Sequence, residues 1–200
     1  MSMQDYALSD NFFSDKRRKE IIDGKIYLMA SPNKKHVSIQ YNLCSIFNDY
    51  FRKGKNKCIS ILANDLYISK TNWLIPDLLV YCKNNNDKKN KKVPLIVVEI
   101  LSESTWKRDV TVKMQKYAEM GIEEYWIIDP EVQRLTIYKL DNTKYEPSQL
   151  YNLPLPVDED IPIKPEDDED EIITEFAPAF FPELIISLED IFNFENLDIL

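Results

Sequence analysis

Short runs of hydrophobic residues, separated by turn-forming residues, dominate the first 140 positions of the chain and predict a β-sheet. Residues 18–22 and 25–29 flank Asp23-Gly24, a dipeptide typical of a two-residue hairpin turn. Further strands are predicted at residues 57–62, 64–69, 73–82, 93–101, 124–128 and 134–140. The segments 73–82 and 93–101 are the longest of these, and their apolar cores are typical of central strands buried on both faces.

Two segments instead carry hydrophobic residues at helical spacing. Ser31-Pro32-Asn33 precedes the first helix, predicted at residues 34–52, and Gly54 follows it as a stop signal. The second helix is predicted at residues 105–120, with Gly121 at its end. This order of elements predicts an α/β protein of the mixed α+β type, in which a twisted mixed sheet is flanked by helices. We expect one domain over residues 1–200.

The composition excludes several kinds of site. Only three glycines occur in 200 residues, too few for the glycine-rich loops that bind dinucleotides or nucleotide phosphates. A single histidine excludes zinc sites built from three histidines. The cysteines are odd in number and lack C-x-x-C spacing, so we expect reduced thiols at Cys44, Cys58 and Cys82. No run approaches 18 apolar residues, and we expect a cytoplasmic protein without a membrane partner.

Charge is distributed unevenly along the chain. Basic residues gather at 16–19, 53–57 and 83–92, which is typical either of nucleic-acid affinity or of a solvated surface. Residues 151–200 contain 15 Asp and Glu but one Lys. Within them, the acidic and proline-containing stretch at about 155–175 is predicted to be a mobile loop or an insertion. It would either compete with nucleic acid for the basic surface or act as a solubilising linker. Residues 176–200 are apolar again and are expected to pack back on the core.

Two carboxylates interrupt the most apolar predicted strands. Asp77 and Glu99 would each be costly to bury alone. If the strands at 73–82 and 93–101 form an antiparallel hairpin, the two residues fall opposite each other. A pair of carboxylate oxygens is suited to Mg²⁺ or Mn²⁺. The alternative is two strand-end carboxylates that face solvent or pair with lysines.

The second predicted helix adds three polar residues on one face. Asp109, Lys113 and Tyr117 are spaced i, i+4, i+8, and the short link from the Glu99 strand keeps the first turns close to it. Lys113 would then place its ammonium beside the carboxylate pair, to neutralise a phosphate or to hold and deprotonate an attacking water. The alternative is a surface ion pair between Asp109 and Lys113.

Several segments together resemble the PD-(D/E)XK nuclease superfamily, and most closely its Uma-type "putative restriction endonuclease" family. The likeness covers roughly residues 17–145 and 179–192. It is carried by an ordered series of motifs: Glu20-Ile21-Ile22-Asp23-Gly24, Ser31-Pro32 with His36, Pro76-Asp77, residues 98–105, Arg108-Asp109 with Lys113, residues 117–130, Phe181-Pro182 and residues 188–192.

The resemblance implies a restriction-endonuclease-like core in which Asp77 and Glu99 bind the metal ion. The superfamily pattern has a lysine two residues after the glutamate, where this chain has Leu101. Lys113 matches the position to which this family has moved that lysine, and it completes the implied catalytic set. Four residues are implied as accessory groups: Glu20 at the metal's edge, His36 toward a phosphate or a ligand, Asp109 and Tyr117. The alternatives are a structural role for His36 at the start of its helix and a packing role for Tyr117, and for Tyr117 packing is favoured.

The function expected from the sequence is a Mg²⁺- or Mn²⁺-dependent endonuclease that hydrolyses DNA phosphodiester bonds. A homodimer would let such a fold cut both strands. One alternative is a nuclease fold that has lost catalysis and binds DNA or a partner protein, as Leu101 and the acidic C-terminal region favour. Another is an acidic-tailed interaction protein without a nucleic-acid role.

Overall fold

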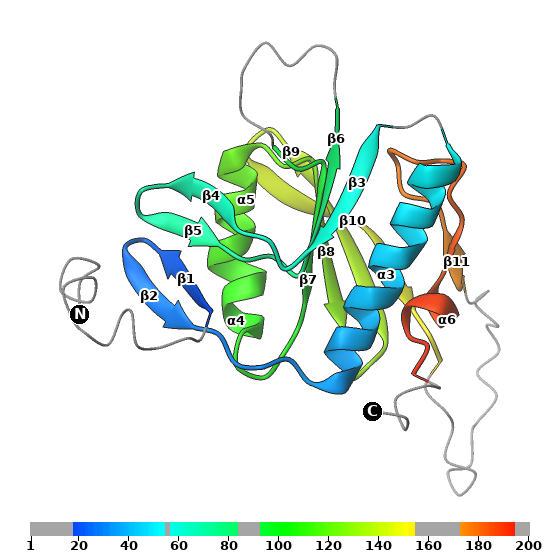
Figure 1. Cartoon of the computed structure of the whole chain (residues 1–200), viewed down its shortest axis with the longest axis horizontal. Coiled ribbons are helices and arrows are strands. Elements are labelled where there is room, and N and C mark those ends of the chain that lie inside the picture. Colours follow the sequence, from blue (N-terminus) through cyan, green and yellow to red (C-terminus); the bar gives the residue numbers. More distant parts are fainter. Residues whose placement is uncertain (1–17, 55–56, 84–92, 155–172, 195–200) are drawn as a thin grey trace, which may run out of the picture.

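Two β-sheets of different size form the body of the molecule (Figure 1). The computed structural model describes residues 18–54, 57–83, 93–154 and 173–194. The larger sheet has the strand order β10-β9-β8-β7-β6-β3, in which only β7 and β8 run parallel. Its strands are β3 (Cys58–Leu62), β6 (Leu78–Cys82), β7 (Ile96–Ile100), β8 (Glu124–Asp129), β9 (Arg134–Asp141) and β10 (Lys144–Asn152).

The smaller sheet is antiparallel and has the order β2-β1-β5-β4. Its strands are β1 (Lys19–Ile22), β2 (Lys25–Leu28), β4 (Leu66–Ser69) and β5 (Asn72–Leu74). The turn between β1 and β2 holds Asp23 and Gly24 at φ of 48° and 76°, so the predicted hairpin is confirmed. A short pair, β11 (Glu175–Phe176) and β12 (Ile186–Ser187), lies toward the C-terminus.

Helices cover both faces of the larger sheet, as Figure 1 shows. The long helix α3 (Lys34–Lys53) confirms the first predicted helix, and the Asn33 side chain caps it by accepting the His36 N–H. Successive residues of the central strands pack alternately on the two faces of the sheet. Val98 packs in the cluster with α3, whereas its neighbour Val97 packs in the cluster with α5 (Met114–Met120). Both faces of the central strands are therefore buried, as their apolar sequence predicts.

The structure corrects two predicted element boundaries. Residues 73–82 are not one strand, because the chain leaves the small sheet after β5 and enters the large sheet at β6. Pro76, which lacks a backbone donor, and the polar Asp77 lie at the crossing between the sheets. Residues 105–120 are not one regular helix. They form α4 (Trp106–Arg108), a π turn η1 (Asp109–Lys113) and α5.

The prediction of reduced cysteines is wrong for two of the three. Cys58 and Cys82 form a disulfide between β3 and β6, whereas Cys44 is free. The two cysteines are Cα partners across these antiparallel strands, although they lie 24 positions apart in the sequence. The sequence also failed to predict β10. That strand is an edge strand with mostly exposed residues and with an irregularity between Pro147 and Gln149, so its alternation is weak.

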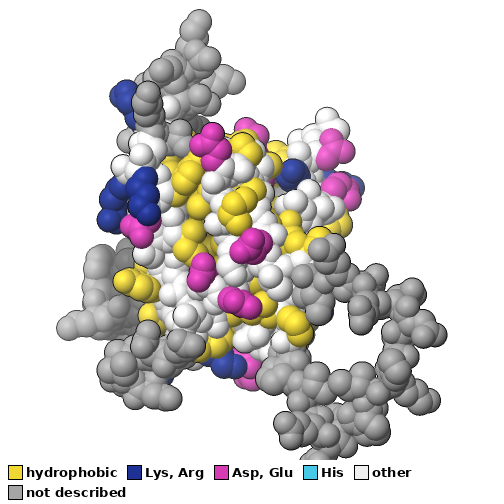
Figure 2. All heavy atoms as spheres, turned by 90° about the vertical axis from the view of Figure 1, so that its right-hand side faces the viewer, with side chains coloured by type: hydrophobic (Ala, Val, Ile, Leu, Met, Phe, Trp, Pro, Cys, Tyr) yellow, Lys and Arg dark blue, Asp and Glu magenta, His cyan; other side chains and the backbone are white. Residues whose placement is uncertain are grey.

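The described C-terminal residues pack against α3. Phe181 contacts the rings of Phe47, Tyr50 and Phe51 at centroid distances of 5.1 to 6.2 Å. The short helix α6 (Leu188–Ile191) adds two buried side chains to the same core. Figure 2 shows this side of the molecule, where acidic and hydrophobic side chains intermingle and Lys and Arg lie mainly at the margins.

Several predicted surface features lie outside the described residues. These are the acidic stretch at 155–172, most of the basic loop at 83–92, and residues 16–17 and 55–56 of the other basic groups. Among the described helices, none has the length and apolar character that crossing a membrane requires.

Replacing Phe181 by Ala should lower the free energy of unfolding by about 3 kcal/mol, because it removes a buried ring from the core under α3. Urea denaturation measures the change. Ile185→Ala is the matched control, since Ile185 is 60% exposed in the same segment and should cost less than about 0.5 kcal/mol. Equal stability of Phe181→Ala and the wild-type protein would contradict the packing of this segment on the core.

Candidate active site

A single lysine joins three buried carboxylates from different parts of the chain. The Nζ atom of Lys113 lies 2.9 Å from Glu20 Oε1, 3.1 Å from Glu99 Oε1 and 3.1 Å from Asp109 Oδ1. Glu20 comes from β1 in the small sheet, Glu99 from β7 in the large sheet, and Asp109 from the π turn. All four side chains are almost fully removed from solvent. The ammonium therefore ties both sheets and the helix together.

The π turn sets the position of the lysine. Asp109 and Lys113 are the first and last residues of η1, and both are buried, whereas the residues between them are only partly buried or exposed. A π turn inserts one extra residue into a helix and is frequent at functional sites. Tyr125 on β8 holds this turn in place, because its hydroxyl donates a hydrogen bond to the Asp109 carbonyl at 2.9 Å.

Glu99 receives two hydrogen bonds on one oxygen. Its Oε1 accepts from Lys113 Nζ at 3.1 Å and from the Tyr117 hydroxyl at 2.5 Å. Burial raises the pKa of the Glu99 carboxyl well above its ordinary value, and the positive charge of Lys113 only partly opposes this. Burial and the negative charge of Glu99 likewise raise the pKa of the Tyr117 hydroxyl, so Tyr117 remains a hydrogen-bond donor.

The charge balance of the network favours a protonated lysine. Burial alone would lower the pKa of Lys113, but Glu99, Glu20 and Asp109 together raise it well above its ordinary value. Burial also raises the pKa of Asp109, although the Lys113 ammonium opposes the shift. Three carboxylates thus share one cation, which leaves this buried cluster short of positive charge.

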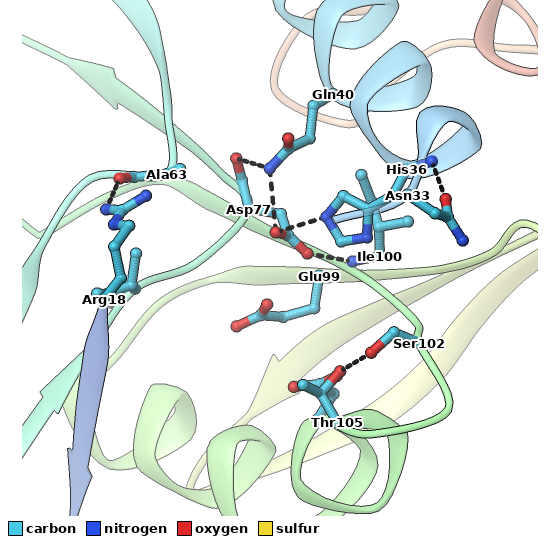
Figure 3. A network of polar contacts seen from close by, with 12 residues as sticks. Arg18, Asn33, His36, Gln40, Ala63, Asp77, Glu99, Ile100, Ser102 and Thr105 are labelled. Atoms are coloured by element: carbon cyan, nitrogen blue, oxygen red, sulfur yellow. Dashed lines mark hydrogen bonds and ion pairs between the residues drawn. The ribbon is translucent and has the colours of Figure 1, made fainter. Parts of the chain in front are cut away.

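Asp77 occupies a second cluster, beside the first (Figure 3). Its Oδ2 accepts the backbone N–H of Ile100 at 2.8 Å, and its Oδ1 lies 2.9 Å from His36 Nε2 and 3.0 Å from Gln40 Nε2. His36 and Gln40 are four residues apart on α3 and therefore face the same side of that helix. The Asp77 carbonyl accepts the N–H of Ala63 at 3.0 Å. Hydrogen bonds therefore hold both the carboxylate and the backbone carbonyl of Asp77 in place.

The register predicted for Asp77 and Glu99 agrees with the strand pairing. Leu78 is the Cα partner of Val98 in β6 and β7, so the next pair outward is Asp77 and Glu99. The two carboxylates nevertheless point to different partners. Asp77 turns toward α3, whereas Glu99 turns toward Lys113, and Figure 3 shows its carboxylate directed away from His36. The Ile100 amide, next to Glu99 in the chain, connects the two clusters.

The structure brings together every candidate residue that the sequence indicated. One cluster holds Glu20, Glu99, Asp109, Lys113 and Tyr117, and the adjacent one holds Asp77 and His36. Sequence reasoning missed Gln40, which binds both the carboxylate and the carbonyl of Asp77. Its spacing of one helical turn from His36 was the signal that could have identified it.

Asp77 and Glu99 fit a divalent cation by the chemistry of their donor atoms. Within the residues that the structure describes, no three His, Cys, Asp or Glu side chains are arranged to enclose a metal ion. Mg²⁺ does not need such a cage, because it usually takes one or two carboxylates and completes its shell with waters and phosphate oxygens. A cation beside Glu99 would also offset the shortage of positive charge around Lys113.

Known proteins are similar to this chain in sequence and in fold. Residues 3–165 match the family described as "Uma2: Putative restriction endonuclease". The uncharacterized protein slr1290 of Synechocystis is 25% identical over 126 residues, which cover 62% of this chain and 66% of the relative, just under two thirds of its length. A crystal structure titled as a putative nuclease from Anabaena variabilis is 21% identical, with a TM-score of 0.63. It covers 96% of this chain and 97% of its own, and it confirms the predicted restriction-endonuclease-like fold.

Replacing Lys113 by Met should lower the free energy of unfolding by about 3 to 5 kcal/mol, because it leaves three buried carboxylates without their shared cation. Lys116→Met is the control, from the adjoining helix α5. Lys116 pairs with the exposed Asp23, and its loss should cost about 1 kcal/mol or less. Urea denaturation of both variants compares the two, and similar losses would contradict the central role of Lys113.

Replacing Glu99 by Gln should change how stability depends on pH. The native pKa of Glu99 lies above its ordinary value of 4.5, so the native state binds this proton more tightly than the unfolded state. The free energy of unfolding of the wild-type protein therefore decreases as pH rises from 4.5 toward the raised pKa. In Glu99→Gln this decrease should be absent, because Gln does not ionise. Denaturation curves between about pH 5 and pH 8 measure the difference. A difference that stays constant with pH would contradict the shift.

Proposed function

Because the chain belongs to the Uma2 family, described as "Putative restriction endonuclease", we propose that it is a metal-dependent endonuclease that hydrolyses DNA phosphodiester bonds. The observation that carries the proposal is the pair of adjacent clusters at the junction of the two sheets, where Asp77 accepts the Ile100 N–H and Glu99 pairs with Lys113. Carboxylates from adjacent strands beside a buried ammonium offer both metal ligands and a cation for phosphate. The match to the solved nuclease fold supports the same reading.

Asp77 and Glu99 would hold Mg²⁺ or Mn²⁺, which supplies Lewis acidity toward the scissile phosphate and lowers the pKa of a bound water. The chain's own residues fix these ligands in place. His36, Gln40 and the Ile100 amide orient the Asp77 carboxylate, and Tyr117 orients Glu99. Such hydrogen bonds to ligand carboxylates are the usual means of orienting them.

Lys113 acts as a cation in this scheme and not as a base. Its raised pKa keeps the ammonium protonated at neutral pH, so it stabilises negative charge that develops on the phosphate. The attacking water's oxygen forms a bond to phosphorus as the bond to the 3′ oxygen breaks. The water's proton passes to solvent and the 3′ oxygen takes up a proton, which gives a 5′-phosphate and a 3′-hydroxyl.

One observation favours a second candidate function, a nuclease fold that only binds DNA or a partner protein. All three Lys113 contacts are to carboxylates of the chain, and the side chain is only 3% exposed. Both oxygens of Asp77 are also engaged. A substrate phosphate would have to displace one of these internal partners to reach Lys113. The proposed enzyme therefore requires that metal and substrate together compensate for the displaced contact.

Calorimetric titration of Mn²⁺, followed by addition of plasmid DNA, tests the proposal. The wild-type protein should bind the ion and nick the plasmid, and EDTA should stop the reaction. Asp77→Ala should lose metal binding, and both Asp77→Ala and Glu99→Gln should slow nicking by at least about 100-fold, since each removes a metal ligand. Asp49→Ala is the control, because Asp49 is an exposed carboxylate on α3 whose only described ion pair is with Arg52.

The outcomes separate the two candidate functions. Metal binding and nicking that both disappear in Asp77→Ala support the enzyme. Unchanged nicking in Asp77→Ala and Glu99→Gln would refute the assignment of these residues. If the wild-type protein binds neither Mn²⁺ nor Mg²⁺, yet is retained on a DNA column in low salt, the second candidate function, a nuclease fold that only binds, is favoured.

A further inference from the structure

Arg108, beside the candidate active site, has no acidic partner among the residues that the structure describes. It is the last residue of α4, directly before the π turn that carries Asp109 and Lys113. Asp109 pairs with Lys113, and no ion pair within the described ranges includes Arg108. The Nε atom of Arg108 is also buried without a hydrogen-bond partner. Buried polar atoms are nearly always hydrogen-bonded, so this position calls for an explanation.

An aromatic ring, and not a carboxylate, holds the Arg108 guanidinium. Its central carbon lies over the ring of Tyr27, 4.9 Å from the ring centroid, which is a cation–π contact. A guanidinium carries five N–H donors around its edge, so contact with one ring leaves donors at its outer end for a phosphate. Arg108 is half-buried, and a ligand can therefore reach that end. Tyr27 thus fixes the position of a cation that has no ion-pair partner in the described part of the chain.

Tyr27 lies on the face of the small sheet that looks toward Lys113. Tyr27 on β2 is the Cα partner of Glu20 on β1, and residues directly opposite each other point to the same face of a sheet. Glu20 Oε1 in turn lies 2.9 Å from Lys113 Nζ. Figure 1 shows α4 next to β1 and β2, in agreement with the contact between Arg108 and Tyr27. The Arg108 guanidinium is therefore one strand away from the lysine network.

A second arginine lies on the same face of the small sheet. Arg18 precedes Glu20 by two residues, and its carbonyl accepts the Met29 N–H, so the pairing of β1 with β2 extends to this position. Arg18 is exposed, and its guanidinium donates a hydrogen bond to the Ala63 carbonyl, as Figure 3 shows. Arg18 and Arg108 thus place two cations within a short distance of Glu20 on the side of the candidate active site.

The charge of the buried network makes a further cation useful to a substrate. Three buried carboxylates share the one ammonium of Lys113, so an approaching phosphate is repelled by the uncompensated negative charge. Lys113 is also engaged by all three carboxylates and is almost fully buried. Arg108, in contrast, is half-buried and stands outside every ion pair of the described residues. A phosphate can therefore bind Arg108 without displacing one of these ion pairs.

We propose that Arg108 binds a phosphate of the DNA strand close to the cleaved bond, and that Tyr27 positions its guanidinium. The inference rests on the proposed function and adds a substrate-binding residue outside the set of carboxylates and Lys113. The contact is present in the bound substrate and in the transition state alike, so it contributes to substrate affinity. Lys113 remains the cation that stabilises charge on the reacting phosphate.

The alternative is a structural role, in which the contact between Arg108 and Tyr27 only holds α4 on the small sheet. That role predicts a clear loss of stability when Arg108 is replaced. The unpartnered Nε favours the opposite result, because Arg108→Met removes a buried polar atom without a partner and keeps an unbranched side chain beside Tyr27. We therefore expect Arg108→Met to unfold at the same urea concentration as the wild-type protein.

Binding of a labelled DNA duplex of about 20 base pairs, in EDTA to prevent cleavage, tests the proposal by fluorescence anisotropy. Arg108→Met should weaken binding about 10-fold and lower the salt dependence by about 0.9 in the slope of log affinity against log salt, the value of one phosphate contact. Arg108→Lys should recover part of the affinity, because an ammonium keeps the charge but not the fork of donors. Tyr27→Ala should weaken binding several-fold, whereas Tyr27→Phe should bind like the wild-type protein because the ring remains.

Lys107→Met is the matched control. Lys107 is the neighbouring residue on α4, is exposed, and has its Nζ 5.5 Å from the centroid of the Trp106 ring. Both residues are thus cations beside an aromatic ring, but only Arg108 lies over Tyr27. Lys107→Met should change the affinity less than about 2-fold. In plasmid nicking, Arg108→Met should raise KM about 10-fold with little change in kcat, because a contact made equally in both states is lost.

Several results would overturn the proposal. They are wild-type affinity in Arg108→Met, an equal loss of affinity in Lys107→Met, or no binding of the duplex by the wild-type protein. Plasmid nicking separates this failure from failure of the proposed function. Metal-dependent nicking with the same KM in Arg108→Met and the wild-type protein would refute the role of Arg108 alone. DNA binding that depends on Arg108, without nicking by the wild-type protein, would support that role and refute the enzyme.

Discussion

Three carboxylates removed from water depend on one ammonium, and much of the structure is arranged around that constraint. An uncompensated buried charge costs several kcal/mol, so the groups that meet Lys113 cannot separate without penalty. Glu20, Glu99 and Asp109 come from the small sheet, the large sheet and the helical segment between β7 and β8. Their shared cation fixes how these three parts pack. The candidate site residues and the fold are thus held by the same interaction.

The same buried network of ion pairs limits the chemistry that the candidate site can perform. A lysine surrounded by carboxylates stays protonated, which favours stabilisation of negative charge over proton abstraction. It is also fully engaged, so a phosphate gains access to it only when an internal contact is exchanged for an external one. The shortage of positive charge in the cluster makes a divalent cation beside Glu99 electrostatically favourable. In the proposed enzyme, metal and substrate would bind to side chains whose orientation is already fixed by hydrogen bonds.

The small sheet has two faces that differ in their surroundings. Its inner face supplies Glu20 to the lysine network, and its outer face exposes Tyr67 and Trp73. The chain crosses from this sheet to the large one at Ile75-Pro76-Asp77, and the Ile75 N–H donates to Glu20 at 3.0 Å. Pro76 and Asp77 therefore lie where the two sheets join.

The sequence by itself determined most of the local elements and indicated the candidate site residues. Hydrophobic periodicity predicted α3 and the central strands, and the unusual position of Asp77 and Glu99 in apolar strands identified both, because burying an isolated carboxylate needs a compensating reason. Only the tertiary structure decided which groups meet. Nothing local pairs Cys58 with Cys82, or Glu20 with Lys113, since such contacts join residues far apart in the sequence. The π turn and the partition of residues 72–82 between two sheets likewise depend on long-range packing, which overrides local propensity.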